Sequence, residues 1–304
     1  MTNIAISTHG DLKKIYKFKQ RVDSNFGDSF EKWKENVLRL ENTADQKLVF
    51  LEENGEVTAL LCSSNFLGAP TLVRVINFDA LNGYITKSIF DSLLDAIGGL
   101  AGIKHPTIGT SILSTQEVEL ELMQSMGFKE VARYSNSELN FLDWEITEIP
   151  LEENFKILSY NDTLKSIDNF DEKFYQLHEE IVSCIPESIH HEDIGLEAFT
   201  QRMKGYAHHR DLSFFMLDDE NLIGLSLVKI DGKNASTLLT GIAKKYQRQG
   251  LARKLKYHLL NKCKSADISK IITHNENDNV SILTLNKELG FKKTVARLIL
   301  EKNL

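Results

Sequence analysis

Two stretches of this sequence repeat each other at a separation of about half the chain. The stretch "GFKEVARYSNSELNF" at Gly127–Phe141 resembles "GFKKTVARLILEKNL" at Gly290–Leu304. A second pair, "FLEENGEVTALLCS" at Phe50–Ser63 and "MLDDENLIGLSLVKI" at Met216–Ile230, places an acidic turn between two apolar strands in each copy. Because both pairs recur in the same order, the sequence predicts two copies of one domain.

The duplication also sets the predicted domain boundaries. The chain has 304 residues, which exceeds the roughly 100 to 200 residues of a typical single domain. We therefore predict one domain over residues 1–145 and a second over residues 154–304. The segment "WEITEIPLEEN" at Trp144–Asn154 is the predicted linker.

Each copy is predicted to be α/β, with a mixed, partly parallel sheet flanked by helices. This class is typical of chains in which strands alternate with amphipathic helices. In the second copy the expected order is a helix at 167–184, strands at 213–216, 223–229 and 235–243, a helix after Gly250, a strand at 270–274, a helix at 280–289 and a closing strand from Lys292.

Composition excludes several classes of function. The net charge of −7 argues against nonspecific nucleic-acid binding, which depends on a broad basic surface. The three cysteines are too scattered for a disulfide framework or a zinc site, so we expect a cytoplasmic protein. No apolar run approaches the roughly 18 residues of a membrane span, so no membrane partner is expected.

One basic stretch stands out against this acidic background. "KKYQRQGLARKLK" at Lys244–Lys256 has six basic residues and no acid, although a helix is expected to begin just after Gly250. Cations near a helix N-terminus oppose the helix dipole, so a bound anion would explain them. Free amides at such a turn form a phosphate site, to which Gln247 and Arg248 can add side-chain donors. A solvated basic helix is the alternative.

The equivalent turn of the first copy lacks these features. Aligning the copies places Gly83 opposite Gly250, and "ALNGYI" at Ala80–Ile85 opposite "QRQGLA" at Gln247–Ala252. Asp79, Asp91 and a single lysine, Lys87, surround Gly83. The first copy is therefore predicted to have lost its anion site.

The second copy resembles a known family. "TGIAKKYQRQGLARKLKYHLL" at Thr240–Leu260 and "THNENDNVSILTLNKELGF" at Thr273–Phe291 look like the acetyl-CoA-binding core of the GNAT superfamily of N-acetyltransferases. The resemblance implies a Q/R-x-x-G-x-G/A loop that binds the CoA diphosphate, and a preceding strand whose backbone contacts the pantetheine. It implies acetyl-CoA as co-substrate, no metal, and a degenerate first copy without a cofactor loop. The cofactor-binding residues so implied are Thr240, Gly241, Ile242, Gln247, Arg248, Gln249, Gly250, Leu251, Ala252, Arg253, Asn279 and Asn286.

Within the family, the helix "NVSILTLNKELGF" at Asn279–Phe291 is similar to that of the subgroup containing mycothiol synthases. Many relatives carry a tyrosine four positions before the closing glycine, where it protonates the leaving thiolate; this chain has Asn286 there. A thiol with a pKa of ~8.5 is a tolerable leaving group near neutrality, so activity does not require that tyrosine.

The catalytic base is the more demanding requirement. A lysine-like amine with a pKa of ~10.4 must lose its proton, which costs roughly 4.6 kcal/mol at pH 7. His274 and Glu276 follow the strand expected beside the thioester and are the candidate bases, although both are also ordinary turn residues. A backbone amide near Ile242 is the expected oxyanion donor, provided that its strand is locally splayed.

The segment before the second hairpin is the candidate acceptor site. Pro186–Arg210 contains two histidine pairs and several acids, and in the resembling family this segment borders the acceptor. We predict that Glu192 and Asp193 attract a cationic amine. A metal site at His190, His191, His208 and His209 is conceivable, but adjacent histidines seldom share one ion, so no metal is predicted.

These observations support an enzyme that transfers acetyl from acetyl-CoA directly to a small-molecule or peptide amine in a ternary complex. The alternative is a non-catalytic acyl-CoA-binding sensor or scaffold. A generic nucleotide-binding domain is a weaker third hypothesis because the loop contains neither G-x-G-x-x-G nor G-x-x-x-x-G-K-[ST]. The acceptor's identity and the oligomeric state stay open.

Overall fold

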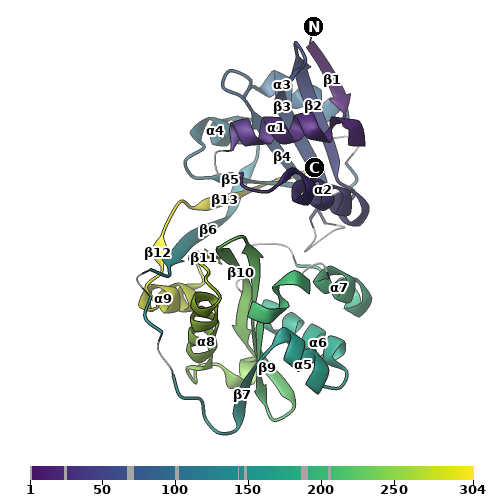
Figure 1. Ribbon diagram of the computed structural model, residues 1–304. Helices are drawn as coiled ribbons and strands as arrows, with labels where there is room; N and C mark the ends of the chain where they lie inside the picture. Colours follow the sequence, from purple (N-terminus) through teal and green to yellow (C-terminus); the bar gives the residue numbers. More distant parts are fainter. Residues whose placement is uncertain are drawn as a thin grey trace. The chain divides into compact units, whose positions relative to one another are not determined.

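The computed structural model describes residues 2–23, 26–66, 72–99, 103–142, 144–146, 149–185, 191–204 and 207–304. The chain forms two compact units. Unit 1 comprises Met1–Arg133, Ile189–Glu192 and Arg297–Leu304, and unit 2 comprises Tyr134–Ser188 and Asp193–Ala296. Figure 1 shows the strands and helices of both units along the chain.

The elements alternate between strand and helix as the sequence predicts. Unit 1 contains β1 (Thr2–Ile6), α1 (Leu12–Val22), α2 (Phe30–Ala44), β2 (Lys47–Glu53), β3 (Glu56–Asn65), β4 (Val73–Ala80), α3 (Lys87–Asp95), β5 (Thr107–Leu113), α4 (Glu117–Ser125) and β13 (Arg297–Asn303). β6 (Lys129–Asn140) begins in unit 1 and continues into unit 2. Unit 2 also contains β7 (Phe155–Ser159), α5 (Tyr160–Ser166), α6 (Phe170–Val182), α7 (Gly195–Lys204), β8 (Phe214–Asp218), β9 (Asn221–Asp231), β10 (Asn234–Ile242), α8 (Leu251–Ser265), β11 (Lys270–Glu276), α9 (Val280–Glu288) and β12 (Lys292–Lys293).

The strands of the two units pair in the same pattern. In unit 1 the order is β1-β2-β3-β4-β5-β13, and only β4 and β5 are parallel. In unit 2 the order is β7-β8-β9-β10-β11-β6, and only β10 and β11 are parallel. Each sheet is therefore mixed and partly parallel, which confirms the predicted fold class.

The last strand of each half lies in the sheet that the other half builds. β13, from the end of the chain, pairs with β5 in unit 1, whereas residues 134–140 of β6 pair with β11 in unit 2. The compact units therefore differ from the contiguous ranges 1–145 and 154–304. Part of the expected linker is also core, because Trp144 is buried in unit 2 and its Nε1 donates to Asn261 Oδ1 at 3.2 Å.

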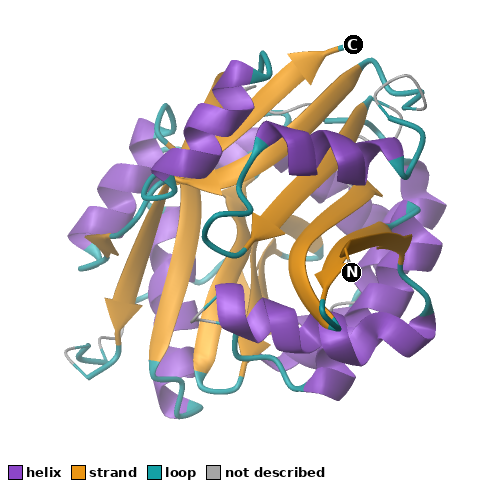
Figure 2. Cartoon of the chain, turned by 90° about the horizontal axis from the view of Figure 1, so that it is seen from above, coloured by secondary structure: helices purple, strands orange, loops and turns teal. Residues whose placement is uncertain are grey.

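Helices cover both faces of each sheet (Figure 2). Side chains alternate between the two faces of a strand, so β8 supplies both cores of unit 2. Phe214 and Met216 pack with α8, whereas Phe215 and Leu217 pack with α5, α6 and α7. Among the described residues, no helix is both long and apolar enough to cross a bilayer.

Candidate functional site

The central feature of unit 2 is a gap between its two parallel strands. β10 and β11 pair only from Asn234↔Lys270 to Ser236↔Ile272. Beyond this point β10 has a register shift against β9 between Thr237 and Leu239, while β11 remains paired with β6 as far as Glu276. The bulge turns β10 away from β11, so the later part of β10 has an open edge.

The open edge presents main-chain groups of the predicted cofactor strand. Ala243 N–H donates to Ile223 O on β9 at 2.8 Å. Because main-chain groups of successive residues point to opposite sides of a strand, those of Thr240 and Ile242 face away from β9. The Ile242 carbonyl accepts a bond of 3.1 Å from Gln247 Nε2, so the Gln247 side chain braces the loop. The amide of Ile242, which the sequence predicts as the oxyanion donor, therefore faces the open edge.

Gly241 lies between these two residues and permits a close helix contact. A Cβ atom at this position would lie 2.3 Å from Cγ2 of Ile181 on α6. Thr240 Oγ1 forms a hydrogen bond of 2.9 Å with Ser226 Oγ on the neighbouring strand β9. Gly241 has no side chain and the Thr240 hydroxyl already has a partner, so these two positions offer a ligand their main-chain groups.

The loop after β10 ends in an uncapped helix N-terminus. Gly250 is the N-cap of α8 with a φ of 76°, and Arg248 has a φ of 62°. No acid lies in the first turn, and Gly250 has no side chain to cap it. In the described part of the chain, the backbone amides of Leu251, Ala252 and Arg253 donate no hydrogen bond. Unbonded amides at a helix N-terminus, together with the helix dipole, are the features that a bound anion requires.

The cations of the basic stretch divide into two groups. Arg253 pairs with Glu288, and Lys254 pairs with Glu152 at 2.6 Å. Lys244, Lys245 and Arg248 are exposed. Arg248 is the one nearest in sequence to the uncapped amides, so its charge adds to the positive potential at the turn.

The equivalent turn of unit 1 is closed by its own residues. β4 and β5 also separate early, because their pairing ends at Val75↔Gly109. However, the Thr86 side chain caps α3 by accepting from Ile89 N at 3.3 Å. Gly83, with a φ of 87°, lies three residues before that cap instead of at the helix start. Unit 1 retains the gap between strands, but one amide of the first turn of its following helix already has a side-chain partner.

Glu276 ends β11 beside the gap and has the properties of a buried base. Glu276 is only 4% exposed, and neither of its carboxylate oxygens has a hydrogen bond of ordinary geometry among the described residues. Burial raises the pKa of this carboxyl, the charge of Asp278 adds to the rise, and the hydroxyl of Tyr134 opposes it. A buried carboxylate without a strong partner is suited to accept a proton.

His274 shares that face of β11 but has a different environment. It is exposed, and its Nδ1 lies 2.7 Å from Asn136 Oδ1. The structure therefore distinguishes the two candidate bases, which the sequence left equal. Glu276 is the buried one.

Comparison with known proteins agrees with this geometry. Residues 174–291 match the Acetyltransferase (GNAT) family model. The tandem GNAT protein from the clavulanic acid biosynthesis pathway has a TM-score of 0.77 at 11% identity, over 100% of this chain and 98% of that one. The chain has a tandem GNAT-like fold. The GCN5-related N-acetyltransferase from Sphaerobacter thermophilus is also similar, with a TM-score of 0.75 at 14% identity, over 99% and 95% of the two chains.

A curated relative matches a shorter region of the chain. N-alpha-acetyltransferase 30 from Schizosaccharomyces pombe (strain 972 / ATCC 24843) is 29% identical over 102 residues. The match covers 31% of this chain and 68% of that protein. Within the tandem GNAT-like fold, the family match lies entirely in the half that carries the uncapped helix.

Two asparagines expected at the cofactor site of the GNAT-like unit 2 have internal partners instead. Asn279 is the N-cap of α9, and its side chain accepts from Ile282 N at 3.4 Å. Asn286 is only 1% exposed; it accepts from Lys256 Nζ and donates to Asn275 Oδ1 at 2.7 Å. Asn286 is therefore part of a buried polar network with Lys256 and Asn275.

Sequence analysis assigned no role to Lys256, although it belongs to this network. Lys256 is 3% exposed, its Nζ lies 5.1 Å from the centroid of the Phe291 ring, and burial lowers its pKa to about 7. Its burial could have been predicted from its position, because Lys256 lies four residues after Ala252 and four before Leu260, on the apolar face of α8.

Burial of Lys256 makes stability depend on pH. Its folded-state pKa of about 7 lies below the ordinary 10.5, so between these values the unfolded chain binds the additional proton. Stability should therefore rise as pH increases from about 7 toward 10. Relative to Lys256→Met, we expect the free energy of unfolding of the native sequence to gain about 3 kcal/mol between pH 7 and pH 9.5, measured by urea denaturation. Lys262→Met, a substitution at an exposed site on the same helix, is the control and should leave this pH dependence unchanged. If the stability of Lys256→Met and that of the native sequence changed with pH in parallel, the assignment of this pH dependence to Lys256 would be wrong.

The predicted acceptor residues are only partly described. Asp193 accepts from the Tyr175 hydroxyl and from Gly195 N at 2.8 Å, and its hydrogen bond with Tyr175 is the main cause that raises the pKa of that hydroxyl to about 12. Glu192 is half-buried. His190 and the side chains of His208 and His209 lie outside the described residues, and among those described no group of three metal ligands occurs.

Proposed function

We propose that this chain is an acetyl-CoA-dependent N-acetyltransferase whose second half holds the cofactor. The observation that carries the proposal is the set of unbonded amides at the start of α8, directly after a strand with an open edge. The family match over residues 174–291 and the similarity to an N-alpha-acetyltransferase support acetyl transfer.

The binding residues of acetyl-CoA follow from their chemistry. The amides of Leu251, Ala252 and Arg253 would hold the diphosphate, with Arg248 adding positive charge. The main-chain groups of Thr240 and the carbonyl of Ile242 would pair with the pantetheine amides, because they face the open side of β10. Gly241 keeps this edge close to α6.

The chemical step requires one base and one oxyanion donor. The acceptor nitrogen would lose a proton to Glu276, directly or through water, and attack the thioester carbonyl carbon. The amide of Ile242 would stabilise the oxyanion. The C–S bond would then break, and the CoA thiolate would leave and take a proton from solvent, because Asn286 is no acid.

The proposed acceptor is a small-molecule or peptide amine. The carboxylates of Glu192 and Asp193 would attract it as a cation before it is deprotonated. The likeness to an N-alpha-acetyltransferase and, in the α9 helix, to the mycothiol synthases keeps both acceptor types in the proposal.

A non-catalytic acyl-CoA-binding module is the second candidate. The observation that favours it is Asn286, which is buried in a polar network at the position of the family's tyrosine. Such a module would bind acetyl-CoA through the same amides without releasing CoA.

A thiol-release assay separates these two functions. Purified protein is incubated with acetyl-CoA and, separately, a polyamine, an aminoglycoside, peptides with free N-termini and an amino-sugar thiol precursor. We expect amine-dependent acetylation, detected by mass spectrometry of the product, with an equal amount of CoA thiol. Tight binding of acetyl-CoA without turnover on any amine would favour the binding module, and absence of binding would overturn both.

A further inference from the structure

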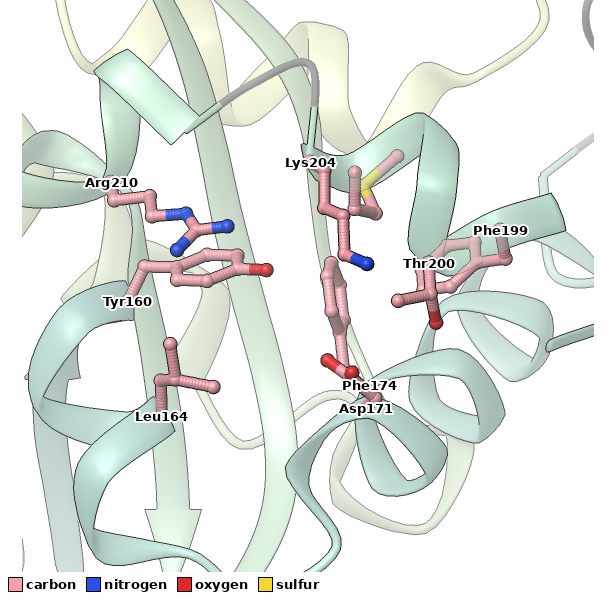
Figure 3. Close-up of a pocket in the computed structure, with 9 residues that line it drawn as sticks. Tyr160, Leu164, Asp171, Phe174, Phe199, Thr200, Lys204 and Arg210 are labelled. Atoms are coloured by element: carbon pink, nitrogen blue, oxygen red, sulfur yellow. The ribbon is translucent and has the colours of Figure 1, made fainter. Parts of the chain in front are cut away.

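A pocket of about 210 Å³ lies in unit 2 among α5, α6, α7 and the short helix before β8 (Figure 3). This volume equals that of about seven water molecules in the liquid, enough for a small organic molecule. None of its lining residues belongs to the open edge of β10 or to the first turn of α8.

Three charged side chains line this pocket: Asp171, Lys204 and Arg210. In Figure 3 the guanidinium of Arg210 and the amine of Lys204 lie on one side, with the carboxylate of Asp171 on the other. None of the three forms an ion pair with another described residue. Arg210 Nε is also buried without an acceptor among the described residues.

An unsatisfied buried donor costs free energy and calls for an explanation such as a bound ligand. Here the guanidinium of Arg210 is held in place, because its Cζ lies 4.8 Å from the centroid of the Tyr160 ring. A fixed guanidinium with free N–H groups is the geometry that recognises a carboxylate.

The rest of the lining limits what else the ligand contains. Phe174, Phe199 and Met203 are buried and form an apolar wall, with the two phenylalanine rings 4.9 Å apart. Thr200 also lines the pocket. The pocket therefore has two cations on one side, one carboxylate on the other and an apolar wall between them. These features are complementary to a molecule with a carboxylate, an ammonium and a short hydrocarbon part.

We propose that this pocket binds a small amino-acid-like zwitterion, with its carboxylate at Arg210 and Lys204, its ammonium at Asp171 and its hydrocarbon part against Phe174 and Phe199. The site is separate from the acetyl-CoA residues. A ligand bound in this pocket would contact α5, α6, α7 and the segment before β8 at the same time.

The test is binding measured without acetyl-CoA, so that it does not depend on acetyl transfer. The probes are L-leucine, L-phenylalanine and 6-aminohexanoate, each compared with the matching carboxylic acid and amine. Binding to the full chain is followed by saturation-transfer NMR and by the shift in Tm. We expect at least one zwitterion to bind more tightly than either of its two single-charge analogues.

Variants assign the contacts. Arg210→Gln should weaken binding of the zwitterion at least 10-fold, and Lys204→Gln, at an exposed position on α7, should weaken it without a risk to folding. Asp171→Asn should abolish the preference for the zwitterion over the acid. Lys165→Gln and Asp168→Asn, at exposed positions outside the pocket, are the matched controls. Absence of binding by every probe at about 20 mM, or equal binding by Lys204→Gln and Lys165→Gln, would overturn the proposal.

Discussion

Replacing Glu276 by glutamine is expected to lower kcat/KM for the amine by about 100-fold or more, with little change in the affinity for acetyl-CoA. General-base catalysis contributes roughly 10² to 10⁴ in rate, and glutamine keeps the size of the side chain while removing its basicity. The measurement is steady-state thiol release on the best acceptor, together with calorimetric binding of acetyl-CoA.

The pH profile provides a second readout of the same group. Because burial raises the pKa of Glu276, activity should fall on the acid side at a higher pH than for an exposed glutamate. This acidic limb should disappear from the residual activity of Glu276→Gln. Glu276→Asp, which retains the base at a different reach, should recover part of the rate.

His274→Ala is the matched control on the same face of β11. His274 is exposed and contacts Asn136, so its loss should change kcat/KM less than about 3-fold. A larger loss for His274→Ala than for Glu276→Gln would assign the base to His274 and contradict our proposal.

The sequence could not distinguish these two residues, because burial at the end of β11 depends on a distant segment. Alternation places positions 274 and 276 on one face of the strand. What packs there includes Tyr134, on the part of β6 that pairs with β11. That pairing joins residues more than a hundred positions apart and leaves no local pattern around Glu276.

The exchange of last strands was unpredictable for a related reason. The repeats at Gly127 and Gly290 established two copies and the mixed sheet of each. The period-2 pattern of a strand specifies its buried face, not which sheet edge it joins. Because both closing strands follow the same Gly-Phe-Lys turn, contiguous domains and exchanged strands fit the sequence equally well.

The uncapped turn before α8 was readable from the sequence because its features are local. A glycine, an absence of acids and a basic first turn occupy adjacent positions, and Gly250 has the positive φ that favours glycine. The separation of β10 from β11 was not readable. "ASTLLTGIA" has the composition of a continuous strand, and the shift between Thr237 and Leu239 has no glycine or proline to mark it.

Replacing Gly250 by valine is expected to weaken acetyl-CoA binding at least 10-fold. A Cβ at this position meets no atom within 4 Å, so the effect does not come from a clash. A left-handed φ costs an L-residue roughly 1 to 2 kcal/mol, and a β-branched residue is among the least tolerant. The backbone would change its conformation at position 250 to relieve this strain, and the amides of Leu251 and Ala252 would then point away from the diphosphate. Calorimetry with acetyl-CoA measures the loss.

Gly83→Val in unit 1 is the control that isolates binding from backbone strain. Gly83 has a φ of 87° and equally open surroundings, so valine there imposes a similar local cost. It should lower Tm about as much as Gly250→Val but leave the affinity for acetyl-CoA unchanged, because Thr86 already caps the helix that follows. Gly250→Asn should retain most of the affinity, since asparagine tolerates the left-handed region. Unchanged affinity in Gly250→Val, or an equal loss in Gly83→Val, would show that the amides of α8 are not where acetyl-CoA binds.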